Sequence, residues 1–141
     1  RPADAAAFAN PLAQIAEGLY DRYAACMDKV DYVGAKDAVM ELIHAANHYI
    51  EDCEPWGLAK DEAKHGELAF VIYNLLEAIR IAAHLLAPFM PQTSVEALRR
   101  IACADEAQCD DLRAACAWGG LAGGAPVEKG DPLFPRLQAD K

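Results

Sequence analysis

The apolar residues of this chain recur mostly at intervals of three and four, which is the period of α-helices with one buried face. The first such stretch predicts a single continuous helix from Leu12 to about Lys29. Asp31 is expected to cap a second helix, whose two adjacent apolar stripes indicate two packing neighbours. This helix should end near Asp52, because Pro55 lacks an amide hydrogen and pushes Glu54 toward extended geometry.

A third stretch is expected to form the central and most buried helix. Its apolar residues between Leu68 and Leu86 cover more than half of the helix circumference, and the charged segment from Asp61 to Glu67 should open it. Pro88 and Pro91 should stop it, because proline interrupts helical hydrogen bonding. The hydrophobic core is therefore expected to lie along this helix.

Shorter elements are predicted beyond the central helix. Thr93-x-x-Glu96 has the spacing of a capping box, which predicts a fourth helix. Asp105 and Gln108 indicate a further cap, followed by a short polar helix that ends near Ala117. Residues 118–124 are rich in glycine and predict a turn-rich exit from the helical part.

The pattern as a whole predicts an all-α fold, an antiparallel helical bundle with an irregular C-terminal extension. We divide it into a helical bundle over residues 1–117 and an extension over residues 118–141 that belongs to the same domain. A chain of 141 residues is long enough for one domain with its own core. Since the first residue is Arg1 rather than Met, we expect the chain to be a segment of a longer protein.

Charge and cysteine content narrow the functional classes. The net charge of −9 argues against a general nucleic-acid binder and against DNA, because such proteins usually carry a basic face. The count of five cysteines is odd and includes no C-x-x-C pair, which favours free thiols in a reducing, cytoplasmic compartment. No run of eighteen apolar residues is present, so we expect no membrane-spanning segment.

The stretch from His44 to Asp61 is the most informative part of the sequence. Trp56 lies between Pro55 and Gly57, where the preceding helix is expected to end and the chain to turn. Proline restricts the backbone on one side and glycine frees it on the other. Such a tryptophan suits a stacking surface for a base, but it equally suits a structural role as a packing residue at a bundle corner.

Three ordered blocks of sequence resemble a known family. Tyr49-Ile50-Glu51, followed by Pro55-Trp56 and Leu58-Ala59-Lys60, is similar to the Y-I-x-x-x-x-P-W-x-L-A-K signature of the anticodon-binding domain of methionyl-tRNA synthetases. The second block runs from Val71 to Pro91 and is similar to that family's Y-N-L-L-E-A-L-R…L-x-P-F-M-P run. The third runs from Val127 to Leu137, where Gly130-Asp131 replaces the usual Pro-Glu. The resemblance covers roughly residues 33 to 137.

This resemblance implies a function in selecting tRNA. The family's Pro-Trp tryptophan stacks on the first base of the CAU anticodon, and the match places that role on Trp56, with Pro55 shaping its loop. The implied partners are the tRNA anticodon loop and the catalytic domain of a parent enzyme, which joins methionine to tRNA using ATP. The family's other main anticodon readers lie on a helix upstream of the matched region, so none is assigned here.

Three further residues are candidates on physical grounds. Asn47 and Glu51 lie four apart and share the helix face that ends near Trp56. An amide and a carboxylate can bond base edges, and a carboxylate accepts from the amino group of cytosine. Lys60, together with Lys64, could neutralise phosphates. The structural alternative is that all of these are ordinary surface residues.

The sequence offers no catalytic constellation and no convincing metal site. Neither an H-I-G-H-like nor a K-M-S-K-S-like motif occurs, and no serine-based triad can be assembled, so we assign no catalytic residue. Candidate metal ligands are the pairs Glu41–His44 and Glu62–His65, with Glu17 and Glu77 in addition, and the pair His44 and His48. In an antiparallel packing of their helices, the two Glu-x-x-His pairs would be displaced from each other by about 12 Å along the helix axes. We therefore expect no metal ligand and no cofactor in this segment. A metal-binding bundle and a purely structural interaction module remain the alternatives.

Overall fold

The computed structural model describes residues 10–105, 109–124 and 126–135, and all regular elements in these ranges are helical. In chain order they are α1 (Pro11–Ala16), α2 (Leu19–Met27), α3 (Tyr32–Cys53), α4 (Pro55–Leu58), η2 (Glu62–Lys64), α5 (His65–Leu86), α6 (Pro91–Arg100) and α7 (Leu112–Ala115). This confirms the predicted all-α class.

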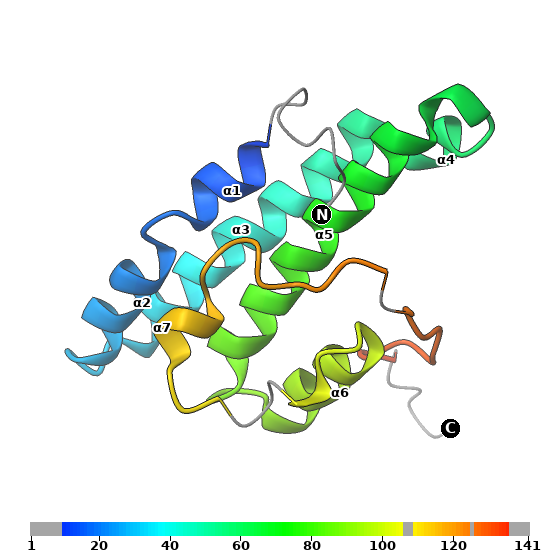
Figure 1. Cartoon of the computed structure of the whole chain (residues 1–141). Helices are drawn as coiled ribbons and strands as arrows, with labels where there is room; N and C mark the ends of the chain where they lie inside the picture. Colours follow the sequence, from blue (N-terminus) through cyan, green and yellow to red (C-terminus); the bar gives the residue numbers. More distant parts are fainter. Residues whose placement is uncertain (1–9, 106–108, 125, 136–141) are drawn as a thin grey trace, which may run out of the picture.

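Two long helices, α3 and α5, lie side by side and run in opposite directions, joined at one end by α4 and η2 (Figure 1). Helices α1 and α2 pack along α3, and α6 packs against α5 near its C-terminal end. The chain after α7 crosses α5 as an irregular extension (Figure 1). The arrangement is the antiparallel bundle that the hydrophobic pattern predicted.

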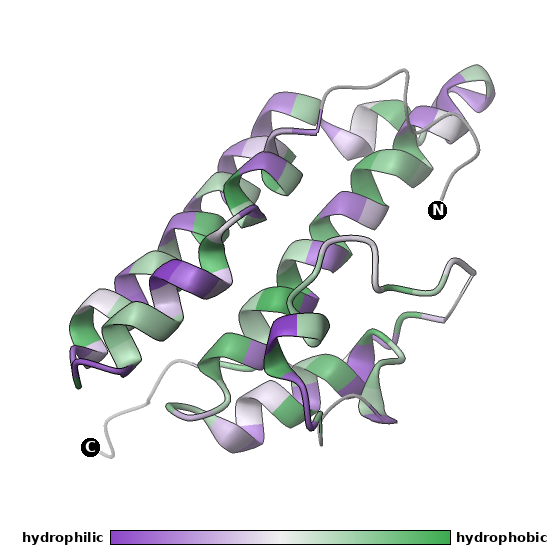
Figure 2. Cartoon of the chain, turned by 60° about the vertical axis from the view of Figure 1, so that its left-hand side comes forward, coloured by the Kyte–Doolittle hydropathy of each residue, from purple (hydrophilic) through white to green (hydrophobic). Residues whose placement is uncertain are grey.

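The core lies along α5, as the sequence indicated. Val71, Ala78, Ile81 and Leu85 of this helix are buried against a cluster that includes Leu42 of α3. The helices carry hydrophobic and hydrophilic residues on different sides (Figure 2), as amphipathic helices do. By length and composition alone the segment Glu62–Leu86 could cross a membrane, but 67% of its most apolar window is buried inside the molecule. That burial is the one expected of a core helix.

The prediction of one helix from Leu12 to Lys29 is wrong, because the chain breaks between α1 and α2. Gly18 adopts a left-handed conformation with φ of 70°, which a residue without a Cβ atom adopts at little cost. The apolar stripe nevertheless continues across the break, with Leu12 before it and Leu19 and Tyr23 after it all buried. Periodicity alone therefore could not locate this break.

The second helix begins as predicted and ends at Cys53, close to the predicted Asp52, but the residue after it has a different conformation from the one predicted. The Oδ1 atom of Asp31 accepts a hydrogen bond from the Gly34 amide at 2.9 Å, which confirms the cap. Glu54, however, is left-handed with φ of 42° and ψ of 59°, not extended. Its carbonyl accepts from the Gly57 amide at 2.7 Å, so the turn is closed locally and Pro55 opens the short helix α4.

The predicted capping box at Thr93-x-x-Glu96 is wrong. Helix α6 begins at Pro91, whose lack of an amide hydrogen suits the first helical position, and no side chain caps it. Glu96 is bound instead by Arg99 and Arg100 of the same helix. Hydrogen bonds from Arg99 and Arg100 lower the pKa of Glu96 to about 2.

The short helix near residue 112 is present, but its cap differs from the prediction. The side chain of Asp111 accepts a hydrogen bond from the Ala114 amide at 3.0 Å at the start of α7. Asp105 lies outside α7, and Gln108 lies outside the described residues. The five cysteines are all free thiols.

Candidate nucleic-acid interface

Helix α4 presents Trp56 to solvent at the corner between α3 and α5. Leu58 of the same helix is buried and packs into the main core cluster, so one face of this single turn is fixed. Trp56 is 56% exposed on the other face. A tryptophan that served as a core packing residue would be largely buried, so this exposure contradicts the packing alternative.

Pro55 and Gly57 flank the tryptophan in unequal ways. Pro55 occupies the first position of α4, where its restricted φ favours the helical turn. Gly57 lies inside the helix, and a Cβ atom added there would meet only the Glu54 Cβ at 3.9 Å. The expectation that Gly57 frees the backbone is therefore wrong, and the left-handed residue is Glu54 instead.

Asn47, Glu51 and Lys60 are exposed around the same corner. Asn47 and Glu51 lie on the last two turns of α3, and Lys60 lies in the turn that follows α4. Among the described residues, no hydrogen bond or ion pair engages these three side chains. They are available to a ligand, but nothing in the geometry itself ties them to the indole of Trp56.

A buried polar chain holds the end of α3 against α5. The amide group of Asn74, which has no exposed surface, donates to the Tyr49 hydroxyl at 3.1 Å. It also accepts from Asn10 at 3.1 Å, which joins the start of α1 to the same point. Burial raises the pKa of the Tyr49 phenol, and burial likewise raises the pKa of the Cys53 thiol. These hydrogen bonds fix the C-terminal end of α3, which leads into the helix that carries Trp56, to α5.

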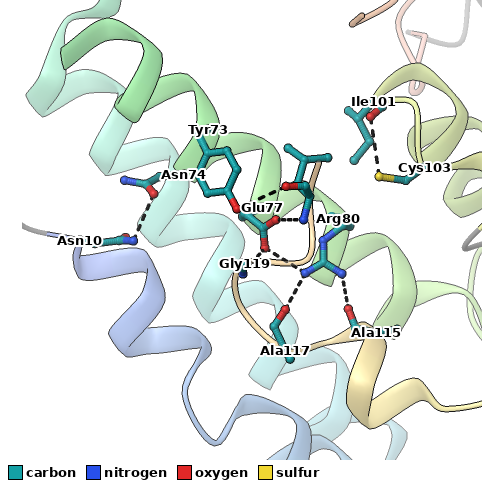
Figure 3. A network of polar contacts seen from close by, with 11 residues as sticks. Asn10, Tyr73, Asn74, Glu77, Arg80, Ile101, Cys103, Ala115, Ala117 and Gly119 are labelled. Atoms are coloured by element: carbon teal, nitrogen blue, oxygen red, sulfur yellow. Dashed lines mark hydrogen bonds and ion pairs between the residues drawn. The ribbon is translucent and has the colours of Figure 1, made fainter. Parts of the chain in front are cut away.

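A second buried network fixes the C-terminal extension to α5 (Figure 3). Glu77 and Arg80 form an ion pair at 2.9 Å, and their side chains are 0% and 1% exposed. The Glu77 carboxylate also accepts from the backbone amides of Gly119, at 2.9 Å, and Leu121. The Arg80 guanidinium donates to the carbonyls of Ala115 and Ala117. The pair thus supplies hydrogen-bond partners to the backbone at the end of α7 and in the irregular segment that follows it.

Sequence reasoning missed this network. The buried polar residues of α5 are Asn74, Glu77, Arg80 and His84, whereas the apolar Ile72 and Ile79 are 40% and 43% exposed. The available signal was the spacing of these polar residues, at intervals of three and four along one side of an otherwise apolar helix. In a sequence, such a row of polar residues looks like the solvent-exposed face of a helix. Only the structure shows that the C-terminal extension covers it.

Two of the candidate metal ligands, Glu77 and Glu41, have arginine partners in the structure. Glu77 belongs to the buried ion pair with Arg80, and Glu41 pairs with Arg22 at 3.0 Å on the surface. In the part of the chain that the structure describes, no group of three or more His, Cys, Asp or Glu side chains is arranged to hold a metal ion. The absence of a metal in this segment stays a prediction.

Replacing Gly120 with alanine tests how tightly the extension is held. A Cβ atom there would lie 2.7 Å from the Arg80 guanidinium carbon. Because the guanidinium is fixed by several acceptors, we expect the variant to lose about 1–3 kcal/mol of unfolding free energy through overpacking. Urea denaturation measures the change.

Gly66→Ala is the matched control, because nothing lies within 4 Å of the added Cβ on the first turn of α5. Its stability should stay the same or rise by up to about 1 kcal/mol. Equal behaviour of the two variants would contradict the close fit between the extension and Arg80.

Comparison with known proteins gives consistent matches. A family model described as the anticodon binding domain of methionyl tRNA ligase matches residues 4–141. The methionine–tRNA ligase of Bacillus subtilis is 37% identical over 136 residues, which is 95% of this chain and 20% of the relative. That of Streptococcus pneumoniae serotype 4 is 38% identical over 134 residues, also 95% of this chain and 20% of the relative.

A solved structure agrees with these sequence matches. The apo form of Mycobacterium tuberculosis methionyl-tRNA synthetase superposes with a TM-score of 0.80 at 28% identity, covering 98% of this chain and 27% of that one. The relatives are tRNA ligases, so the class is a helical domain found in enzymes of that kind. Within it, the chain belongs to the family of anticodon-binding domains of methionyl tRNA ligase. It spans about one-fifth of the length of the curated relatives that it matches.

Proposed function

We propose that this chain selects tRNA by its CAU anticodon as one domain of a longer, cytoplasmic ligase that joins methionine to tRNA. The observation that carries the proposal is the exposure of Trp56 on a corner that is fixed from below by Leu58 and by the Tyr49–Asn74 hydrogen bond. A rigid, exposed indole provides a flat apolar surface that loses little conformational freedom when a base stacks on it.

The neighbouring residues supply the other interactions that a base needs. Stacking alone is tolerant of sequence, because every base has an aromatic face. The amide of Asn47 and the carboxylate of Glu51 provide hydrogen-bonding groups on the same side of α3, and a carboxylate accepts from the amino group of cytosine. Lys60 provides a phosphate contact beside the corner. Pro55 contributes through the turn that orients Trp56.

The net charge of −9 makes this a local and selective site rather than a general RNA-binding surface. Methionine activation with ATP belongs to a separate catalytic domain in this proposal, and the chain itself contributes selectivity. We assign it no cofactor, no catalytic residue and no DNA or membrane partner.

Tryptophan fluorescence tests the proposal directly. When an RNA stem-loop with a CAU anticodon is added to the longer ligase, stacking on Trp56 should quench part of the emission. A Trp56→Phe variant identifies that part by difference, and a stem-loop with its first anticodon base changed is the control RNA. Equal quenching in both proteins, or by both RNAs, would contradict anticodon recognition at this corner.

A further inference from the structure

The buried polar chain that leads toward the Trp56 corner has a defined direction. The Oδ1 atom of Asn10 accepts from the Ala13 amide at 3.1 Å, so its Nδ2 group donates to Asn74 Oδ1, also at 3.1 Å (Figure 3). The Nδ2 group of Asn74 in turn donates to the Tyr49 hydroxyl at 3.1 Å. Each of the two side-chain amides therefore has only one orientation that makes both of its hydrogen bonds.

The Tyr49 hydroxyl continues this chain to the last residue of α3. It is hydrogen-bonded to the Cys53 thiol, one helical turn further along. Because the hydroxyl oxygen already accepts from Asn74, its proton is available to the sulfur. Burial raises the pKa of the Tyr49 phenol, and the hydrogen bond with Cys53 also acts to raise that pKa, as it does when the phenol is the donor. The chain thus runs from the start of α1 through α5 to Cys53.

Cys53 is followed at once by a strained residue. Glu54 is left-handed, with φ of 42° and ψ of 59°, a conformation that residues other than glycine seldom adopt. Such a conformation persists only where the surrounding structure fixes it. On the far side of Glu54, Leu58 is buried in the core, and on the near side the polar chain holds Cys53. Trp56 lies between these two anchors, so its position depends on both.

Filling the core would not require polar groups at these positions. Asn74 is 0% exposed and Tyr49 is 8% exposed, and apolar side chains of similar size would occupy the same space without needing partners. A buried chain of hydrogen bonds instead favours a single arrangement of the helices that it joins, because any shift leaves a buried donor or acceptor unpaired. Here the helices are α1, α3 and α5, joined about one turn before the Trp56 corner.

We propose that Asn74 and Tyr49 are positioning residues for anticodon recognition, acting on Trp56 through the end of α3. Neither side chain contacts the RNA in this proposal; the two keep the indole in the orientation in which a base stacks on it. The inference rests on the proposed function in taking Trp56 as the stacking residue. It adds that the selectivity of the corner depends on buried residues of α3 and α5.

Hydrogen exchange in the longer ligase without tRNA tests whether the polar chain holds the corner. The reporter is the Gly57 amide, which donates to the Glu54 carbonyl at 2.7 Å and closes the turn. Tyr49→Phe keeps the ring and removes the hydroxyl, so we expect the Gly57 amide to exchange at least about threefold faster. Asn74→Leu removes two hydrogen bonds and should have a larger effect. Mass spectrometry with fragment resolution measures the rates.

Tyr73→Phe is the matched control. Tyr73 precedes Asn74 on α5, is also 8% exposed, and donates from its hydroxyl to the Leu121 carbonyl at 3.5 Å. The substitution therefore removes a buried hydroxyl from the neighbouring position, but on the side of the C-terminal extension. It should lower the overall stability about as much as Tyr49→Phe and leave the exchange rate of the Gly57 amide unchanged.

Aminoacylation kinetics test whether this positioning matters for tRNA. Tyr49→Phe should raise KM for tRNA with a CAU anticodon about three- to tenfold, while kcat and ATP-dependent activation of methionine stay near normal. Tyr73→Phe should change none of these constants. In a Trp56→Ala background, Tyr49→Phe should raise this KM no further, because Tyr49 acts only through the indole.

An unchanged exchange rate of the Gly57 amide in Tyr49→Phe, or an equal increase in Tyr73→Phe, would overturn the proposal. Faster exchange with an unchanged KM for tRNA would overturn it too, as would full additivity with Trp56→Ala. Failure of the proposed function is recognised separately, because Trp56→Ala would then keep its KM and its preference for CAU. The exchange measurement involves no RNA, so it identifies a failure of the positioning alone.

Discussion

Replacing Glu77 with alanine should cost about 3–5 kcal/mol of unfolding free energy, because it leaves the buried Arg80 charge without its carboxylate partner. The cost has a second source, since the amides of Gly119 and Leu121 lose their acceptor. Urea denaturation measures the total. Hydrogen exchange reports on the lost backbone hydrogen bonds separately, because the Leu121 amide should exchange faster in this variant than in the unchanged protein.

Glu41→Ala is the matched control, because Glu41 also pairs with an arginine, Arg22, but both side chains are about half exposed. This variant should lose less than about 1 kcal/mol of unfolding free energy, as is usual when a surface ion pair is removed. In a double-mutant cycle, Glu77→Ala and Arg80→Ala together should cost clearly less than the sum of the two single changes. A Glu77→Ala loss no larger than that of Glu41→Ala would show that the network does not hold the extension.

The sequence predicted the helices through their apolar periodicity and failed where a local interaction decided the outcome. The central helix was found because burial on several faces requires continuous apolar coverage. The break at Gly18 was missed because the buried stripe continues on both sides of it. The start of α6 was misplaced because Pro91 fits equally well after one helix and at the first turn of the next.

The buried polar stripe of α5 could not be predicted from periodicity at all. Asn74, Glu77 and Arg80 are buried by partners that are distant in sequence, namely Tyr49 and the extension after α7. Polar side chains enter a core only when partners satisfy them, and those partners are known only once the fold is known. The domain division at residue 117 stays a prediction, although these bonds tie both parts together.

The candidate site was predictable in its residues but not in its geometry. The Pro55-Trp56 pair and the polar residues around it can be located in the sequence by resemblance and helical spacing. Whether Trp56 points inward or outward depends on the left-handed Glu54 and on Leu58, which turns the other face of α4 toward the core. The roles of Asn47, Glu51 and Lys60 stay predictions, because no ligand contact fixes them.

Replacing Trp56 with alanine in the longer ligase should lower kcat/KM for charging tRNA with a CAU anticodon roughly ten- to hundredfold, because a stacked base contributes ~1–3 kcal/mol. Discrimination against tRNA with a changed first anticodon base should weaken with it. ATP-dependent activation of methionine should stay near normal, since that step needs no tRNA and belongs to another domain in our proposal. Because Trp56 is 56% exposed, the melting temperature should change little.

Trp118→Ala provides the opposite control. Trp118 is partly buried and packs against the main core cluster, so its removal should lower thermal stability. It lies far along the chain from the corner, in the extension, and anticodon discrimination by the folded protein should persist. If Trp56 stacks on the anticodon, Trp56→Ala should lose discrimination while keeping its stability. Trp118→Ala should lose stability while keeping its discrimination. If Trp56→Ala instead lost stability and kept its preference for CAU, the indole would be a packing residue, and the anticodon would be recognised elsewhere.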